Sequence, residues 1–147
     1  MLNRRESRQQ AFEFIFEKSF TGNDAEDIIR NAGDARDAEI SEYAETILRG
    51  VSEHMDEIDG YISAYSERRK ITRLSRVVLT ALRLAMYEII YVSDLDPTIS
   101  INEAVELTKK FSGRDESGYV NGVLAGFLRA YNDGKIQPVE TTGGEEQ

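Results

Sequence analysis

Basic side chains gather at two places in the sequence. Arg4, Arg5 and Arg8 stand close together near the N-terminal end, and residues 68–76 hold five further basic residues. An arginine guanidinium can grip a phosphate with two hydrogen bonds and can stack on a nucleobase. Arginines at the start of a helix also oppose the helix dipole, and a bound phosphate would relieve that conflict. Phosphate binding is therefore the chemistry that these residues predict, with a solvated helix end as the alternative.

Side chains suited to catalysis or metal binding are scarce. The chain has no cysteine, His54 is its one histidine, and it has neither a glycine-rich phosphate loop nor a Gly-x-Ser-x-Gly motif. A general base needs a nucleophile within reach, and the sequence motifs indicate none for His54. We expect His54 at the surface or as a helix cap. We therefore expect a binding protein and not an enzyme, with no cofactor and no metal site.

The length and the net charge of the chain limit the classes of protein to which it can belong. The chain has 147 residues and a net charge of −9, which is the size of one domain. Residues 23–60 carry twelve acidic and three basic residues, so they predict a solvated face or a surface for a basic partner. No apolar run approaches the ~18 residues that span a membrane, and the polar N-terminal end does not resemble a secretory signal. We expect a cytoplasmic protein that does not bind membranes.

Hydrophobic periodicity is helical nearly throughout and predicts an all-α fold. In the first half it predicts three helices, over Arg4–Phe20, Ala25–Asn31 and Ile40–Tyr65. Asp24 would cap the second helix and Gly33 would end it. Gly60 would bend or break the third helix, and the polar residues 66–73 predict a connector.

The second half predicts three more helices. The first begins at Leu74 and is apolar on more than one face, as is typical of a helix buried at the centre of a domain. Ser100 to Glu103 fits a capping box for the next helix, which Gly113 ends. Asp115 would cap the last helix.

This pattern predicts one cooperative domain over residues 1–132. It would consist of two packed three-helix subdomains, at about 1–66 and 74–132, because neither half buries much apolar surface alone. The acidic tail 133–147 contains one of the two prolines of the chain and two adjacent glycines, and it predicts disorder.

Three glycines of the last predicted helix, Gly118, Gly122 and Gly126, are spaced four residues apart. They strip one helix face of side chains, at about 1 kcal/mol per glycine relative to alanine. Another helix or a ligand backbone is therefore expected close to this face. Beside it, Tyr119 is either at the edge of the core or exposed and able to stack on an unpaired base.

Three motifs in the second half resemble a known family. Residues 81–88 read ALRLAMYE, residues 101–107 read INEAVEL and residues 119–124 read YVNGVL. Their sequence, order and spacing resemble the signatures of the bacterial transcription antitermination factor NusB family. The arginine-rich start of the first helix is similar as well, so the resemblance covers residues 74–131 strongly and residues 4–16 more weakly.

The resemblance implies an all-α fold of two three-helix subdomains and a role in transcription antitermination. It implies binding, together with NusE, to the boxA element of nascent ribosomal RNA as a single strand. NusE is a ribosomal protein that doubles as a transcription factor. The complex would join RNA polymerase and suppress termination in ribosomal RNA operons.

The resemblance also assigns roles to single residues. The residues that it assigns to RNA binding are Arg4, Arg5, Arg8, Ser75, Arg76, Asp115 and Tyr119. Phe16 takes the place of an aromatic residue that lies toward NusE in the family. Many family members carry a charge early in the central helix, near Val78, so we expect an apolar contact to NusE there instead. A connector folded back beside the first helix would join residues 68–76 and the N-terminal arginines into one basic strip.

A second hypothesis stays open. Glu6 and Ser7 interrupt the arginine run and the chain is net acidic, and both features would weaken RNA binding. The alternative is a non-catalytic interaction scaffold that binds RNA weakly. It would be a monomer, or a homodimer that hides the arginines.

Overall fold

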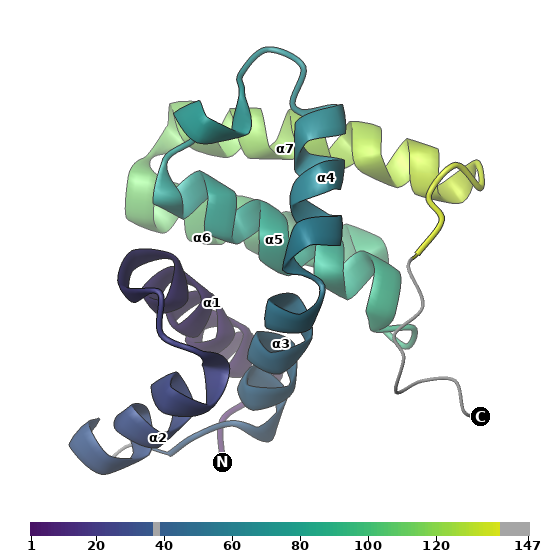
Figure 1. Cartoon of the computed structure of the whole chain (residues 1–147). Coiled ribbons are helices and arrows are strands. Elements are labelled where there is room, and N and C mark those ends of the chain that lie inside the picture. The colour runs from purple at the N-terminus through teal and green to yellow at the C-terminus, as the bar shows by residue number, and fades with distance from the viewer. Residues whose placement is uncertain (37–38, 139–147) are drawn as a thin grey trace.

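The computed structural model describes residues 1–36 and 39–138, and every regular element within these ranges is helical (Figure 1). The elements in chain order are α1 (Arg4–Thr21), α2 (Ala25–Arg36), α3 (Glu42–Glu53), α4 (Met55–Tyr65), the 3-10 turn η1 (Ile71–Arg73), α5 (Arg76–Tyr91), α6 (Pro97–Ser112) and α7 (Arg114–Asn132). The all-α prediction is confirmed. None of the helices described is both long enough and apolar enough to cross a membrane.

Helix α5 is the centre of the fold. It packs against α1, α3, α4, α6 and α7, and nine of its 16 residues are buried. A helix that is apolar nearly all round has to be covered on every side. Figure 1 shows this arrangement, with α1 and α3 below α5 and with α7 above it.

Side chains placed before α1 and α6 fix where these helices begin. The Asn3 side chain accepts from the Glu6 backbone N–H at 2.8 Å, and the Glu6 carboxylate accepts from the Asn3 N–H at 3.0 Å. This reciprocal capping box fixes the first turn of α1. Asp96 caps α6, whose first residue is Pro97. The capping box expected at Ser100 is wrong, because Ser100 lies inside α6 and is buried.

Two helix ends differ from those expected. Asp24 accepts from the N–H of Asp27 at 2.9 Å, as a cap should, but α2 runs past Gly33 to Arg36. A glycine destabilises a helix by only about 1 kcal/mol relative to alanine. A helix therefore continues through a glycine when packing of the residues beyond it is favourable.

The chain breaks at His54 and not at Gly60, which lies inside α4. Burial of Ile58 and Ile62 on either side of this glycine holds the helix together. α4 then packs against α5 and α7. Within the described residues, the part of the chain before the connector therefore forms four helices and not the three expected.

His54 holds the cap position between α3 and α4, but its side chain is buried. Its ring stacks on Tyr91 with 4.3 Å between centroids, and Nδ1 lies 3.0 Å from Oε1 of Glu57. Tyr61 and Tyr91 donate to the same carboxylate at 2.9 and 2.7 Å. Burial, followed by the contact with Glu57, raises the pKa of Tyr61 to about 12. In the described part of the chain, no group of three or more His, Asp and Glu residues could hold a metal ion.

The start of the predicted disordered tail packs on the fold. Ile136 is buried, and the Gln137 carbonyl accepts from the Tyr61 hydroxyl at 3.1 Å. The expectation of disorder over 133–147 is therefore wrong for 133–138. Residues 139–147 lie outside the described residues.

A tight contact between α3 and α5 yields a stability prediction. A Cβ added at Gly50 would overlap the Tyr87 hydroxyl and ring, so we expect Gly50→Ala to lower the free energy of unfolding by about 1–3 kcal/mol. The control Gly60→Ala adds a Cβ that meets no described atom within 4 Å. It should raise stability by about 0.5–1 kcal/mol. Urea unfolding followed by circular dichroism measures both, and a Gly50→Ala variant as stable as the wild type would contradict the close contact.

Candidate nucleic-acid and protein-binding surfaces

The first turn of α1 presents two of the predicted arginines to solvent. The Arg4 guanidinium lies over the Tyr43 ring, 4.0 Å from the centroid. Arg5 donates from Nε and Nη2 to Glu103 at 3.2 and 2.8 Å, and its side chain is 78% exposed. The hydrogen bonds to Glu103 raise the pKa of Arg5, whose guanidinium is charged at any physiological pH in either case. The two arginines form a cationic end of α1 that is ordered before any ligand arrives.

Arg8 differs from these two arginines because its side chain is buried. Nε donates to both carboxylate oxygens of Glu88, at 3.2 and 2.9 Å. The side chains of Arg8 and Glu88 are 3% and 0% exposed. The Tyr43 hydroxyl donates to the same carboxylate, and burial, followed by the Glu88 charge, raises the pKa of Tyr43. The structure therefore does not bring Arg8 to the surface where RNA binding was expected.

Two signals in the sequence point to this burial. Arg8 shares its helical register with the core residues Ala11 and Ile15, so it belongs to the inner stripe of α1. Glu88 is the one acidic residue of the mostly apolar α5. Because charges inside a protein are almost always paired, an inward Arg and an inward Glu predict each other.

The second position assigned to RNA lies at the other end of α1. Ser75 caps α5 by accepting from the Val78 N–H at 3.2 Å, and the exposed Arg76 guanidinium lies 5.0 Å from the Phe20 ring centroid. An α-helix rises 1.5 Å per residue, so about 22 Å separate Arg5 from Phe20 along α1. The single basic strip expected from the sequence is therefore wrong, and the two cationic positions are separate.

Arg69 covers the predicted stacking residue of α7. Its guanidinium lies 4.1 Å from the Tyr119 ring centroid and binds Glu116 at 3.1 Å. The ring of Tyr119 is half-buried beneath this cation. Asp115 is exposed in the first turn of α7, and Gly113 holds the N-cap position expected for it. Residues 69 and 119 are far apart in the chain, so no local pattern could predict their contact.

The glycine face of α7 is open. A Cβ at Gly118 or Gly122 would meet nothing among the described residues within 4 Å, so the close helix expected there is absent from the described chain. The face forms part of a shallow groove together with Tyr65, Arg68 and Arg129.

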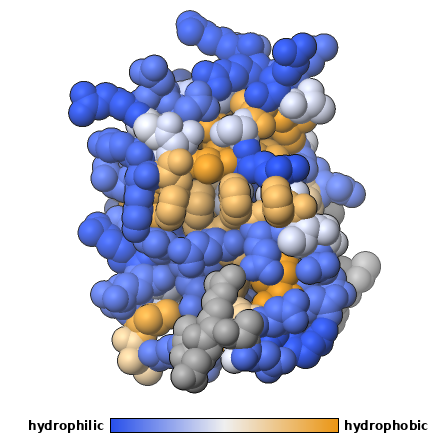
Figure 2. Space-filling view, turned by 90° about the vertical axis from the view of Figure 1, so that its left-hand side faces the viewer, coloured by the Kyte–Doolittle hydropathy of each residue, from blue (hydrophilic) through white to orange (hydrophobic). Residues whose placement is uncertain are grey.

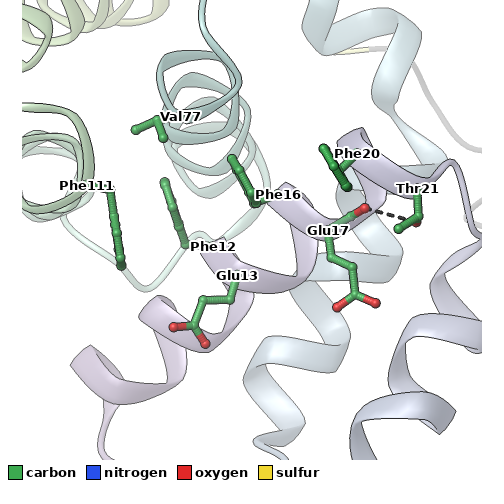
Figure 3. Close-up of a pocket in the computed structure, with 8 residues that line it drawn as sticks. All are labelled: Phe12, Glu13, Phe16, Glu17, Phe20, Thr21, Val77 and Phe111. Carbon is green, nitrogen blue, oxygen red and sulfur yellow. Dashed lines mark hydrogen bonds between the residues drawn. The ribbon is translucent and has the colours of Figure 1, made fainter.

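An apolar groove, which we call the aromatic groove, lies between α1, α5 and α6 (Figure 3). The residues that line it are Phe12, Phe16, Phe20, Val77 and Phe111, with Glu13, Glu17 and Thr21 beside them. Phe12 and Phe111 stack with 5.4 Å between centroids, and Phe20 and Phe111 are 68% and 44% exposed. Figure 2 shows an apolar band bordered by hydrophilic surface on this side of the molecule.

The structure places the two predicted partner residues differently. Phe16 lies in the row of rings, between Phe12 and Phe20 (Figure 3). Val78 is fully buried, so the partner contact expected there is wrong. Its neighbour Val77 lines the groove instead. Successive residues of a helix point about 100° apart, so Val78 faces the core while Val77 faces the groove.

Comparison with known proteins gives the family. A family model described as the NusB family matches residues 5–129. The chain belongs to the NusB family. Transcription antitermination protein NusB from Rubrobacter xylanophilus is 40% identical over 125 residues, which cover 85% of this chain and 89% of that protein. The NusB protein from Natranaerobius thermophilus is 40% identical over 128 residues, which cover 84% and 92%.

Solved structures give the same assignment. A chain in a crystal structure of the antitermination factors NusB and NusE with double-stranded RNA matches with a TM-score of 0.78 and 27% identity, covering 87% of this chain and 97% of that one. The resemblance to the NusB family, first drawn from three motifs, is therefore confirmed. The NusB family match begins at Arg5, so it includes Arg5 and Arg8 but not Arg4.

The buried ion pair predicts strong coupling between its members. Glu88→Met or Arg8→Met alone leaves one buried charge unpaired and should lower the free energy of unfolding by about 3–5 kcal/mol. The double variant removes both charges and should recover most of that loss. Urea unfolding of the four proteins measures the coupling. Arg49→Met, which opens the exposed pair with Glu26, is the control and should change little. Strictly additive losses would contradict the pairing.

Proposed function

We propose that this NusB-family protein is an RNA-binding transcription antitermination factor. It would act with NusE on single-stranded boxA RNA, as part of the RNA polymerase antitermination complex, and suppress termination in ribosomal RNA operons. Family membership and the likeness to a NusB–NusE complex with RNA support the proposal. The observation that carries it is the arrangement on α1, which has a cationic end and, along its side, a partly exposed row of phenylalanines.

On the RNA side, Arg4 and Arg5 would grip phosphates at one end of α1. Arg76, beside Ser75, would provide a second cationic contact at the other end. A base would stack on the Arg69–Tyr119 pair, with Asp115 close by, because guanidinium planes and aromatic rings both stack on bases. Arg8 would act through the protein and not by touching RNA, since it is buried.

On the protein side, the aromatic groove would receive NusE. The groove combines the stacked pair Phe12 and Phe111 with the exposed ring of Phe20, and such an apolar, aromatic surface is typical of the centre of a protein interface. Glu13 and Glu17 beside the rings favour a partner surface with basic side chains at its edge. A second copy of the chain in this groove is the competing occupant, in line with the scaffold hypothesis.

The test of the proposed function is fluorescence anisotropy with a labelled single-stranded boxA RNA. The protein is titrated at one stated salt concentration, with and without NusE, against a scrambled RNA of the same length. Selective binding that NusE strengthens supports the proposal. Binding that is equally weak for both RNAs, with a dimeric mass by light scattering, would favour the scaffold.

The cationic end of α1 predicts a change in salt dependence. Arg4→Ala with Arg5→Ala removes two phosphate contacts, so RNA affinity should fall for boxA and scrambled RNA alike. The slope of log K against log salt should become less steep by about 1.4, at ~0.7 per phosphate for a single strand. Arg30→Ala removes an exposed arginine on α2 and is the matched control. An unchanged slope in the double variant would exclude these arginines from the interface.

The aromatic groove predicts a separate effect on partner binding. Phe16→Ala should weaken NusE binding at least tenfold, since a buried aromatic anchor typically contributes 2 kcal/mol or more, a rough value for such hot spots. RNA binding without NusE should stay unchanged. Ile99→Ala removes an exposed apolar side chain outside the groove and is the control. Calorimetry with purified NusE measures both variants, and equal affinities would place NusE elsewhere.

A further inference from the structure

The Glu103 carboxylate stands between a surface arginine and a buried one. It accepts two hydrogen bonds from Arg5, at 3.2 and 2.8 Å. Its Oε1 also lies 3.9 Å from Nη1 of Arg8, within ion-pair range but beyond a hydrogen bond. A shift of about 1 Å would bring this second contact to the 2.7–2.9 Å of a charge-assisted hydrogen bond. Glu103 therefore has two partners within reach and bonds one of them.

Arg8 has hydrogen-bonding capacity that its other contacts leave unused. Its Nε is committed to Glu88, which fixes the guanidinium plane. Its Nη2 is buried and bonds no acceptor among the described residues. The nitrogen that faces Glu103 is the other one, Nη1, at 3.9 Å. A closer carboxylate would add a charge-assisted hydrogen bond at Nη1 and leave Nη2 as it is.

Binding of phosphate to Arg5 creates a problem that this geometry can solve. A phosphate on Arg5 competes with Glu103 for the same donors. The Glu103 side chain is only 14% exposed, so water alone would poorly solvate the displaced carboxylate. Arg8 is the cation close enough to receive it.

We propose that Glu103 is a partner-exchange residue: it holds Arg5 in the free protein and moves to Arg8 when Arg5 binds an RNA phosphate. The inference rests on the proposed function for its ligand, and it assigns Arg8 a role that needs no contact with RNA. Arg8 is then a positioning residue that receives the displaced carboxylate. Glu103 sets how much of the phosphate affinity of Arg5 is realised.

The exchange can be tested without RNA. Arg5→Ala removes the surface partner, so Glu103 should move to Arg8 as it would when phosphate occupies Arg5. In NMR spectra of the arginine side chains, the Arg8 guanidinium signals should shift, and its Nη protons should exchange more slowly with water. A crystal structure of this variant should show the Glu103–Arg8 distance falling from 3.9 Å to about 2.8 Å. Arg8 signals that stay at their wild-type positions would overturn the exchange.

Glu103→Gln tests the same carboxylate through RNA affinity. Removing the competing charge should strengthen RNA binding about two- to fivefold, the range of an exposed ion pair. The matched control is Glu106→Gln, which removes an equal charge from α6 at a residue that pairs with Lys109. Its effect should be smaller. If Glu103→Gln weakens RNA binding, Glu103 serves only to orient Arg5 and the exchange is overturned.

The two experiments separate failure of the inference from failure of the proposed function. Wild-type protein that binds RNA, combined with an Arg5→Ala variant whose Arg8 signals are unchanged, overturns the exchange alone. Wild-type protein that binds no RNA, combined with shifted Arg8 signals, overturns the proposed function and leaves the exchange in place for another phosphate ligand. Addition of tripolyphosphate to the wild type then reports the exchange directly through the same signals.

Discussion

The buried ion pair between Arg8 and Glu88 is the interaction on which the rest of this structure depends. It joins α1 to α5, and Tyr43 brings α3 to the same carboxylate. Because an unpaired buried charge costs about 3–5 kcal/mol, the pair favours one register of α1 on α5. With Arg8 pointing inward, helical geometry sets Arg5 and Phe16 on one side of α1. One contact inside the protein thus places both outer surfaces.

The net charge of −9 describes the chain but not the face with which it would bind. Arg5 and Arg76 are separated along α1 by more than the ~8–10 Å Debye length, so each acts on a polyanion independently. The aromatic groove, flanked by Glu13 and Glu17, lies between these two cationic positions. An RNA strand that touched both ends would cross apolar and acidic surface there. A protein seated in the groove would cover that surface, which explains why RNA and protein partner would bind better together.

Periodicity predicts the helices well because each helix buries an apolar stripe, and the central position of α5 follows from its apolar residues all round. What local patterns miss is pairing between distant residues. The sequence predicts Arg8 as a surface cation because Glu88 is 80 positions away in the chain. It leaves Tyr119 either at the edge of the core or exposed, because the contact with Arg69 is equally non-local. The resemblance indicates a partner contact near Val78 but does not resolve which of two adjacent residues faces outward. Val77 lines the groove, and Val78 points about 100° away from it into the core. The break at His54 depends on how α4 docks, which no single helix encodes.

The anchoring of residues 133–138 has a practical consequence. Ile136 is buried and Gln137 is tied to Tyr61 on α4, so the end of the described chain leaves the fold on the right of Figure 1, whereas α1 and the left ends of α6 and α7 face the opposite way. The Met1 amino group, by contrast, pairs with Glu39, close to the start of α1. A fluorophore, affinity handle or surface tether is therefore better attached directly after Pro138 than at Met1, because the chain at residue 138 lies away from both candidate surfaces.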